Sequence, residues 1–368
     1  MEASGFERLQ DFDAGKLIGY GTVKATIDTR TATRSTAESS FLQMAVRGSD
    51  TIKLYPNALA TRITFDATKK ATGVDVMSNV ATSTELKYHL SVNKEVIVTA
   101  GVWRSPQLLM VSGVGPADTL QQHGIDVVAD LPAVGQDEWD QPARPMMSQV
   151  GVKTHTQLNA GSPEVVAEQL DLYLNHQSGM LSGLAGGQAT AFDKFSVSNR
   201  ANFSDSTKEW LDSFPSDWPR RAIQPGMHTP KSKGNMTISS ASILDSPVIS
   251  PNWYEDEADV EMAYAAFQRL REIGSNWDSS VNLGEVFPGP DVSSKDNIIE
   301  WLRNNSFQMS HGSSTTKMGT DDKTSVVDSQ GRVHGVTGLR VGDAAAFPFC
   351  PPDFPCRPPF AESILEGN

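Results

Sequence analysis

The pattern of hydrophobic and polar positions in the first hundred residues predicts one short helix and several strands. A helix opening from Ser and Thr caps is expected within residues 34–42. Alternating patterns predict β-strands at 51–55, 60–65 and 72–77. The run 94–101 has a continuous apolar centre, which predicts a strand covered on both faces, as in a parallel sheet.

A helix is predicted directly after that strand. Gly101 ends the strand, and Ser105 and Pro106 supply a cap and a proline for the first helical turn. The helix continues to Val111, and a second short helix is expected at 117–123. Strand, glycine turn and helix in succession are the pieces of a doubly wound nucleotide-binding fold, although Gly-x-Gly at 113–115 lacks a third glycine.

Beyond Pro142 the pattern changes to a mixture of helices and strands. Strands are predicted at 146–152, 234–240 and 248–254, and helices at 163–175 and 258–273. The polar segment 193–210 is expected to be loosely structured. We therefore predict an α+β domain over residues 143–305.

A single histidine lies in a small-residue loop after the predicted helix 297–303. His311 opens the Gly-, Ser- and Thr-rich stretch 311–319, and the run 339–348 then predicts a buried strand leading into a loop. Imidazole titrates near neutral pH and small neighbours leave room for a substrate, so His311 suits proton transfer. A histidine that only satisfies buried backbone groups is the alternative, and it is the interpretation we favour for His334. The histidines show no spacing typical of metal ligands.

Composition and charge narrow the possible partners. The 368 residues are 38% hydrophobic with a net charge of -13, which argues against nucleic acid or an anionic membrane as a partner. The sequence contains no run of eighteen or more apolar residues, so no transmembrane helix is predicted. The first residues lack the features of a secretory signal, so the chain as given is expected to be cytoplasmic. Cys350 and Cys356 could pair, but two thiols do not make a disulfide framework.

Several stretches resemble the signatures of the glucose-methanol-choline (GMC) flavoprotein oxidoreductases. Residues 99–115 are similar to the second family signature, and 134–142 to its "VGQN-x-x-D-x-P" element, with Asp137-Glu138 in place of an Asn-apolar pair. Residues 231–235 resemble the family's Ser-Arg-Gly stretch, and 311–319 with 339–348 resemble its C-terminal signature. The resemblance is strongest to the fungal branch that contains patulin synthase-like and versicolorin B synthase-like members.

This resemblance implies an α/β fold: a Rossmann-like remnant of a GMC-type FAD domain with an inserted α+β substrate-binding domain. The partial FAD-binding domain would occupy residues 1–142, the substrate domain 143–305, and a C-terminal return with the active-site loop 306–368. It implies FAD as cofactor and His311 as catalytic base of a flavin-dependent alcohol oxidoreductase acting in fungal secondary metabolism. The residues placed beside the flavin are Gly101, Ser105, Pro106, Asp343 and Ala344.

Departures from the family pattern open other possibilities. The diphosphate-binding Gly-x-Gly-x-x-Gly turn of the family's N-terminal portion does not occur in this sequence, so FAD is expected to bind weakly or not at all to this chain alone. Phe354 stands in the predicted substrate pocket where the family has a second His or Asn, and phenylalanine cannot move a proton.

Three interpretations follow from these departures. The first is an FAD-dependent alcohol oxidoreductase completed by another chain or a longer product of the gene. The second is a flavin-independent cyclase, dehydratase, isomerase or pericyclase that uses the same pocket. The third is not an enzyme but a degenerate partner subunit or a pseudogene product. The expected partner is a small-molecule substrate, with a homo-oligomer or a complementing chain as further possibilities.

Overall fold

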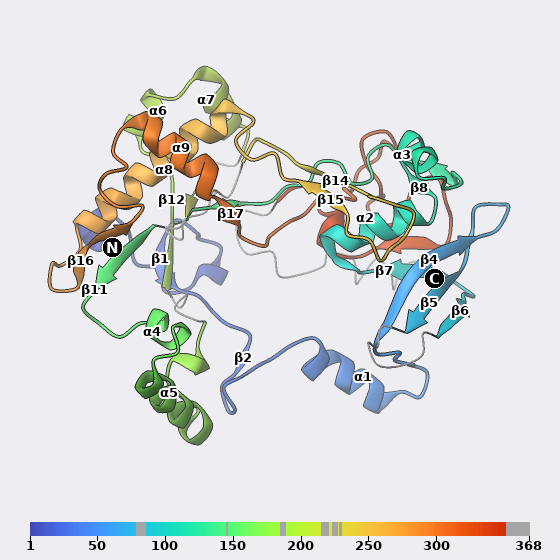
Figure 1. The fold of residues 1–368 in the computed structure, drawn as a ribbon, viewed down its shortest axis with the longest axis horizontal. Helices are drawn as coiled ribbons and strands as arrows, with labels where there is room; N and C mark the ends of the chain where they lie inside the picture. Colours follow the sequence, from blue (N-terminus) through green and yellow to red (C-terminus); the bar gives the residue numbers. More distant parts are fainter. Residues whose placement is uncertain are drawn as a thin grey trace. The chain divides into compact units, whose positions relative to one another are not determined.

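The computed structural model describes residues 1–78, 86–144, 146–184, 189–214, 221–222, 227 and 230–350. The chain divides into two compact units, which are described separately (Figure 1). Unit 1 comprises Met1–Leu54, Arg144–Gly226 and Met262–Asn305; unit 2 comprises Tyr55–Ala143, Met227–Glu261 and Ser306–Asn368. In the described residues, no helix is both long and apolar enough to cross a bilayer.

Unit 2 contains a three-stranded antiparallel sheet, a parallel strand pair and the helix between them. The sheet has the order β4-β5-β6, and β7 pairs in parallel with β18, joining Val96 to Leu339 and Val98 to Val341. The elements are β4 (Ala58–Phe65), β5 (Ala71–Ser78), β6 (Lys87–Ser91), β7 (Val96–Val98), α2 (Gly101–Val111), β8 (Val114–Gly115), α3 (Ala117–Gln122), β9 (Ala129–Asp130), β10 (Pro142–Ala143), β14 (Asn235–Thr237), β15 (Val248–Ser250), β17 (Phe307–Gln308), β18 (Leu339–Val341) and the 3-10 turn η5 (Ala344–Ala346).

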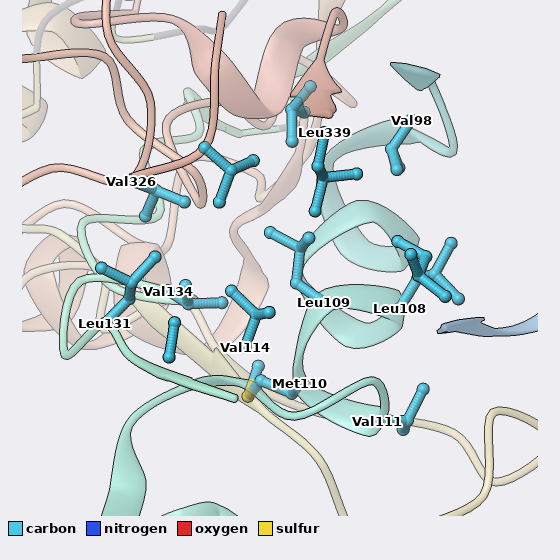
Figure 2. Close-up of a cluster of buried hydrophobic side chains, with 14 of the residues drawn as sticks. Val98, Leu108, Leu109, Met110, Val111, Val114, Leu131, Val134, Val326 and Leu339 are labelled. Carbon is cyan, nitrogen blue, oxygen red and sulfur yellow. The ribbon is translucent and has the colours of Figure 1, made fainter. Parts of the chain in front are cut away.

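The core of unit 2 forms where α2 packs on the parallel pair. Figure 2 shows Leu108, Leu109 and Met110 of α2 among side chains from β7, β18 and the 326–334 region, including Val98 and Leu339. Burial of these side chains is the main force that holds the strand–helix–strand arrangement together. This packing fixes the carboxyl ends of β7 and β18 at one edge.

Unit 1 combines helices with short sheets. β1 pairs with β12 and β12 with β13, all antiparallel, while β11 pairs with β16. The elements are η1 (Glu2–Ser4), η2 (Phe12–Ala14), β1 (Gly19–Thr22), β2 (Ile27–Asp28), β3 (Thr33–Arg34), the π-helical turn η3 (Glu38–Leu42), α1 (Gln43–Gly48), β11 (Met147–Val150), α4 (His155–Asn159), α5 (Pro163–His176), η4 (Met180–Ser182), β12 (Ala189–Asp193), α6 (Val197–Ala201), α7 (Asp205–Asp212), β13 (Arg221–Ala222), most of α8 (Glu257–Ser275), β16 (Asn282–Phe287) and α9 (Lys295–Asn305).

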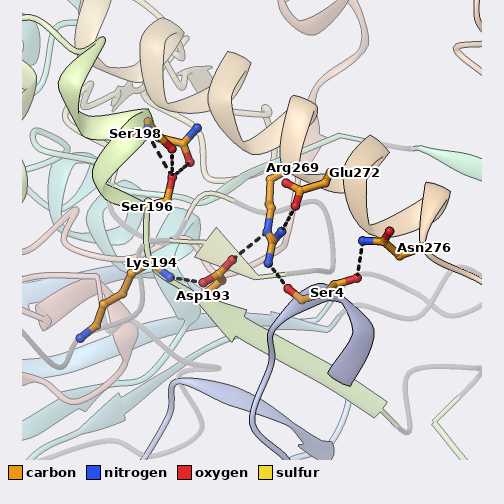
Figure 3. A network of polar contacts seen from close by, with 9 residues as sticks. Ser4, Asp193, Lys194, Ser196, Ser198, Arg269, Glu272 and Asn276 are labelled. Carbon is orange, nitrogen blue, oxygen red and sulfur yellow. Dashed lines mark hydrogen bonds and ion pairs between the residues drawn. The ribbon is translucent and has the colours of Figure 1, made fainter.

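A polar network joins the start of the chain to the rest of unit 1. Arg269 of α8 donates to Asp193 at the end of β12, to Glu272 and to the backbone carbonyl of Ser4 (Figure 3). Asn276 donates to the Ser4 hydroxyl from the same helix. One guanidinium therefore connects three segments that are far apart in sequence.

Some sequence expectations were wrong, each for a local reason. Residues 51–55 form no strand: Leu54 is exposed, and in the described part of the chain no second strand pairs with this run, as a ladder requires. The segment 193–210 is not loose but contains α6 and the start of α7. Ser196 and Ser204 cap these helices by accepting from the backbone amides of Asn199 and Thr207.

The strand and helix around residue 100 also differ from the prediction. Ile97 of β7 is 40% exposed, so the strand is covered on one face and not on two. The helix begins at Gly101 instead of Ser105, and Pro106 therefore lies inside it. Gly101 enters the helix with a φ of +85°, a conformation that favours glycine.

The two units group the chain differently from the predicted domains. Residues 1–54 pack with the middle of the chain, although the prediction assigned them to the FAD domain, and 227–261 pack in unit 2. Compact packing units and the domains of a family need not coincide. The domain assignment stays a prediction.

Candidate active site

His311 is placed by a backbone ladder between two distant segments of unit 2. β17 pairs with β10, the Met309 amide donates to the Gln141 carbonyl at 3.1 Å, and Trp139 and Ser313 exchange backbone hydrogen bonds of 3.1 Å. The segments 139–143 and 307–313 therefore run antiparallel. This pairing positions His311 opposite Asp140 and Gln141.

Three hydrogen bonds connect Asp140, Gln141 and His311. Asp140 Oδ1 accepts from the backbone amides of Gln141 at 2.7 Å and His311 at 3.1 Å. Gln141 Oε1 lies 2.8 Å from Nδ1 of the His311 ring. Burial lowers the pKa of His311, which keeps the imidazole neutral at pH 7. A neutral imidazole can accept a proton.

A second titratable side chain lies on the same segment. Glu138 is 1% exposed, and neither carboxylate oxygen has a hydrogen-bond partner in the described part of the chain. Burial, with a smaller contribution from the negative charge of Asp140, raises the pKa of Glu138 to about 8. The segment that faces His311 thus carries a carboxyl group that is mostly protonated at pH 7, and this group lies against Gly234.

Asp343 joins the end of β18 to the start of α2. Its Oδ2 accepts from the Gly101 amide at 2.9 Å and from the Ser105 hydroxyl at 2.6 Å, while Oδ1 accepts from the Ala345 amide at 2.8 Å. A carboxylate at a helix N-terminus satisfies an otherwise unpaired amide and complements the helix dipole. Asp343 is therefore the residue that starts α2 at Gly101.

The His311 loop contacts this edge through a second ladder. The amides of Ser314, Thr316 and Met318 donate to the carbonyls of Ala344, Ala345 and Ala346, at 3.2, 2.7 and 3.1 Å respectively. Predicted site residues from three parts of the sequence are thus brought together in unit 2. They are His311, Gly101, Ser105, Pro106, Asp343 and Ala344.

Pro106 leaves one carbonyl of α2 without its helical donor, and the His311 loop supplies a donor instead. Proline has no N–H, so the carbonyl four residues earlier, that of Val102, loses its helical donor. The Thr315 hydroxyl donates to this carbonyl at 2.6 Å. Pro106 therefore acts as an attachment point for the loop that carries His311.

Two lysines lie near the altered family element. Lys317 forms an ion pair with Asp137, and Lys233 lies 4.7 Å from the centre of the Trp139 ring. Burial lowers the pKa of Lys233, an effect that the charge of Asp137 opposes. Asp137 has a φ of +58°, a conformation that Asn and Asp tolerate better than other residues with a side chain.

The comparisons with known proteins agree with this arrangement. Models described as "GMC oxidoreductase" match residues 1–143 and 230–359. The chain belongs to the GMC oxidoreductase family. A glucose methanol choline oxidoreductase of Aspergillus terreus is 38% identical over 99% of this chain and 62% of its own length.

Two further GMC relatives are named as synthases. A versicolorin B synthase of Emericella nidulans is 36% identical over 95% of this chain and 57% of its own length. A patulin synthase of Aspergillus clavatus is 35% identical over 94% of this chain and 58% of its own length. The chain spans about three-fifths of the length of these relatives.

Solved structures of GMC-type enzymes confirm the α/β fold. An FAD-dependent oxidoreductase from Chaetomium thermophilum aligns with a TM-score of 0.81 and 24% identity, covering 96% of this chain and 68% of its own. A fungal aryl-alcohol oxidase aligns with a TM-score of 0.78 and 21% identity, covering 96% and 66%. Identities this low show the fold alone.

The residues around Gly101 suit part of a flavin. An added Cβ at Gly101 would meet no atom within 4 Å, so there is open space over the start of α2, at the edge where β7 and β18 end. Doubly wound folds bind nucleotide cofactors at this kind of edge. The open space at Gly101 leaves room for part of a flavin ring, but the Gly101 amide and the Ser105 hydroxyl already donate to Asp343, and the sequence provides no glycine-rich turn for the diphosphate.

The sequence did not identify every residue of the site. Asp140 and Gln141 belong to the recognised 134–142 element, but no role was assigned to them, and Thr315 was likewise missed. Asp140 matches the Asp of the "VGQN-x-x-D-x-P" element, and this match was the available signal for the first two. Phe354, predicted for the substrate pocket, lies outside the described residues.

Proposed function

We propose that this chain carries the proton-transfer part of an FAD-dependent oxidation of a small alcohol in fungal secondary metabolism. The observation that supports this most directly is the placement of His311, whose ring contacts Gln141 and whose loop pairs with Ala344–Ala346, directly after Asp343. The names of the relatives, versicolorin B synthase and patulin synthase, support a substrate from secondary metabolism.

His311 is the base of this reaction. Its ring takes the hydroxyl proton of the alcohol while the carbon loses a hydride, so the product is a carbonyl compound. Partial burial lowers the pKa of the ring, which keeps the imidazole neutral before the proton arrives. A bound flavin would supply the hydride acceptor.

We further propose that tight FAD binding requires residues beyond this chain, supplied by a complementing chain or a longer product of the gene. The absence of a Gly-x-Gly-x-x-Gly turn from the sequence supports this. The test is the visible spectrum of the purified chain before and after FAD is added and removed by gel filtration. A colourless protein after filtration is expected; flavin bands that remain with the protein at a one-to-one ratio contradict it.

The role of His311 is tested by alcohol-dependent reduction of a dye at saturating FAD. We expect His311→Gln to reduce turnover by roughly 10²- to 10⁴-fold, the usual contribution of a general base. His334→Gln is the matched control, because the His334 ring contacts the Gly319 carbonyl and Ser325 and is not part of the site. Equal turnover in wild type and His311→Gln excludes His311 as the base.

A second candidate function is supported by Glu138. A protonated carboxyl group and a neutral imidazole on facing segments are the acid and base that a flavin-independent dehydration, isomerisation or cyclisation requires. If this function is correct, flavin-free protein turns over its substrate, and Glu138→Gln abolishes that turnover. Turnover that needs FAD and survives Glu138→Gln favours alcohol oxidation instead.

A further inference from the structure

The side chain of Gln141 contacts the ring of His311 directly. Gln141 is 0% exposed, so its amide must find hydrogen-bond partners inside the protein. Asp140 fixes the backbone on both sides of this contact, because one carboxylate oxygen accepts from both the Gln141 and the His311 amides. Backbone hydrogen bonds to Asp140 therefore hold both segments at the contact between the Gln141 amide and the imidazole.

The orientation of the Gln141 amide follows from its two neighbours. Its oxygen lies 2.8 Å from His311 Nδ1, and its side chain also forms a hydrogen bond with Cys350. Burial raises the pKa of the Cys350 thiol, and the hydrogen bond from Gln141 opposes this rise, as an amide N–H pointing at sulfur does. The amide nitrogen thus faces Cys350 and the oxygen faces His311.

An amide oxygen only accepts hydrogen bonds, so the imidazole nitrogen opposite it must carry the proton. In a neutral imidazole one nitrogen is protonated and the other holds the lone pair. With the proton on Nδ1, the lone pair of His311 lies on Nε2.

We propose that Gln141 is a positioning residue that holds neutral His311 in the Nδ1–H tautomer and thereby makes Nε2 the basic nitrogen. The consequence for catalysis rests on the proposed function of His311 as base. The tautomer itself does not, and it can be measured without flavin or substrate.

The experiment is two-dimensional NMR of the intact chain labelled with ¹⁵N in its histidine rings, recorded above the pKa of His311. The His311→Gln variant assigns its signals. His334 and His155 are internal references for the opposite tautomer, because the Nε2 atom of each contacts a backbone carbonyl, that of Gly319 and of Met180. We expect the proton of His311 on Nδ1 and those of the two references on Nε2.

Two substitutions test whether Gln141 is the cause. Gln141→Met keeps the shape but removes the acceptor, and we expect His311 to shift to the Nε2–H tautomer that imidazole prefers in water. Gln141→Glu keeps an acceptor, and we expect it to retain Nδ1–H. An Nε2–H signal for His311 in the wild type, or an unchanged signal in Gln141→Met, overturns the proposal.

Turnover measurements separate this proposal from the proposed function. We expect Gln141→Met to lower kcat by about tenfold or more with a smaller change in KM, because substrate binding remains while the base is misoriented. If wild-type His311 shows Nδ1–H but no alcohol is oxidised, the proposed function fails and the assignment of the tautomer stands. If oxidation depends on His311 while the wild type shows Nε2–H, the reverse holds.

Discussion

At the scale of single residues, the site depends on what burial does to titratable groups. Burial lowers the pKa of His311 and raises that of Glu138, because in both cases it disfavours the charged form. Asp140 is also buried and its pKa is raised, although hydrogen bonds from the Gln141 and His311 amides oppose the shift. Burial thus favours the uncharged form of all three groups, which lie on two facing segments.

Glu138 predicts a pH-dependent stability. The unfolded chain ionises this group near 4.5, whereas the folded chain holds the proton until about pH 8. Between these values the folded state binds more protons, so the free energy of unfolding falls as pH rises, by roughly 1 kcal/mol per pH unit. We expect Glu138→Leu to remove this slope and to be more stable than wild type at pH 8, by an amount on the order of a few kcal/mol.

Urea unfolding at pH 5, 6.5 and 8 measures this effect. Glu164→Leu is the control, because Glu164 is an exposed position in the first turn of α5. Its unfolding free energy should follow the wild-type pH dependence. A wild-type slope that persists in Glu138→Leu would show that other groups cause it.

At the scale of elements, hydrogen-bonding groups of α2 that lack a helical partner are paired by residues outside the helix. The proline that weakens the helix leaves the Val102 carbonyl without a helical donor, and Thr315 supplies one. Asp343 does the same for the Gly101 amide at the start of the helix. The His311 loop is therefore attached to α2 by bonds that a regular helix would not offer.

The Thr315 bond predicts a specific coupling between two substitutions. Thr315→Val leaves the partly buried Val102 carbonyl without its donor, and we expect it to lower the free energy of unfolding by about 1–3 kcal/mol. Pro106→Ala restores an N–H that can donate to Val102, so Thr315→Val should cost less in that background. Chemical denaturation of the double-mutant cycle measures the difference.

Thr316→Val is the matched control for this cycle. The Thr316 hydroxyl is buried and has no hydrogen-bond partner among the described residues, so its loss should leave stability unchanged or increase it. Equal costs of Thr315→Val in the wild-type and Pro106→Ala backgrounds would contradict the proposed role of the proline.

At the scale of the whole molecule, net charge acts independently of these contacts. The chain carries -13 at pH 7 with a pI near 5.0. Mutual repulsion opposes association when the net charge is large, and it disappears at the pI. Exposed apolar side chains such as Phe41 and Met44 of the η3–α1 segment are available for association once repulsion is lost.

We therefore expect the protein to be least soluble near pH 5. Light scattering against pH, at low and at high salt, measures this: scattering should peak near pH 5 at low salt and change less with pH when salt screens the charges. Because protonation of Glu138 favours the folded state in the same range, solubility and folding stability should change in opposite directions between pH 8 and pH 5. If light scattering increases only where the protein unfolds, loss of solubility and loss of stability are not independent, and this prediction is wrong.

The sequence by itself determined the family, the fold class and the elements whose signals are local. The patterns at 60–65, 72–77, 163–175 and 258–273 predicted β4, β5, α5 and α8 to within a few residues, since side-chain period and helix caps are properties of adjacent positions. The motif around His311 likewise identified the loop that contains it. The caps at Ser196 and Ser204 are local features too, but the polar composition of residues 193–210 predicted a loosely structured segment and not the two capped helices.

Only the tertiary structure decided which groups meet. His311 and Gln141 are 170 residues apart, Thr315 and Val102 213, and Gly101 and Asp343 242. No periodicity reports such contacts, because they depend on strand pairing and on the packing of α2 against β7 and β18. The same packing decided that Glu138 is buried without a hydrogen-bond partner among the described residues, and burial, which is a property of the folded chain alone, sets its pKa.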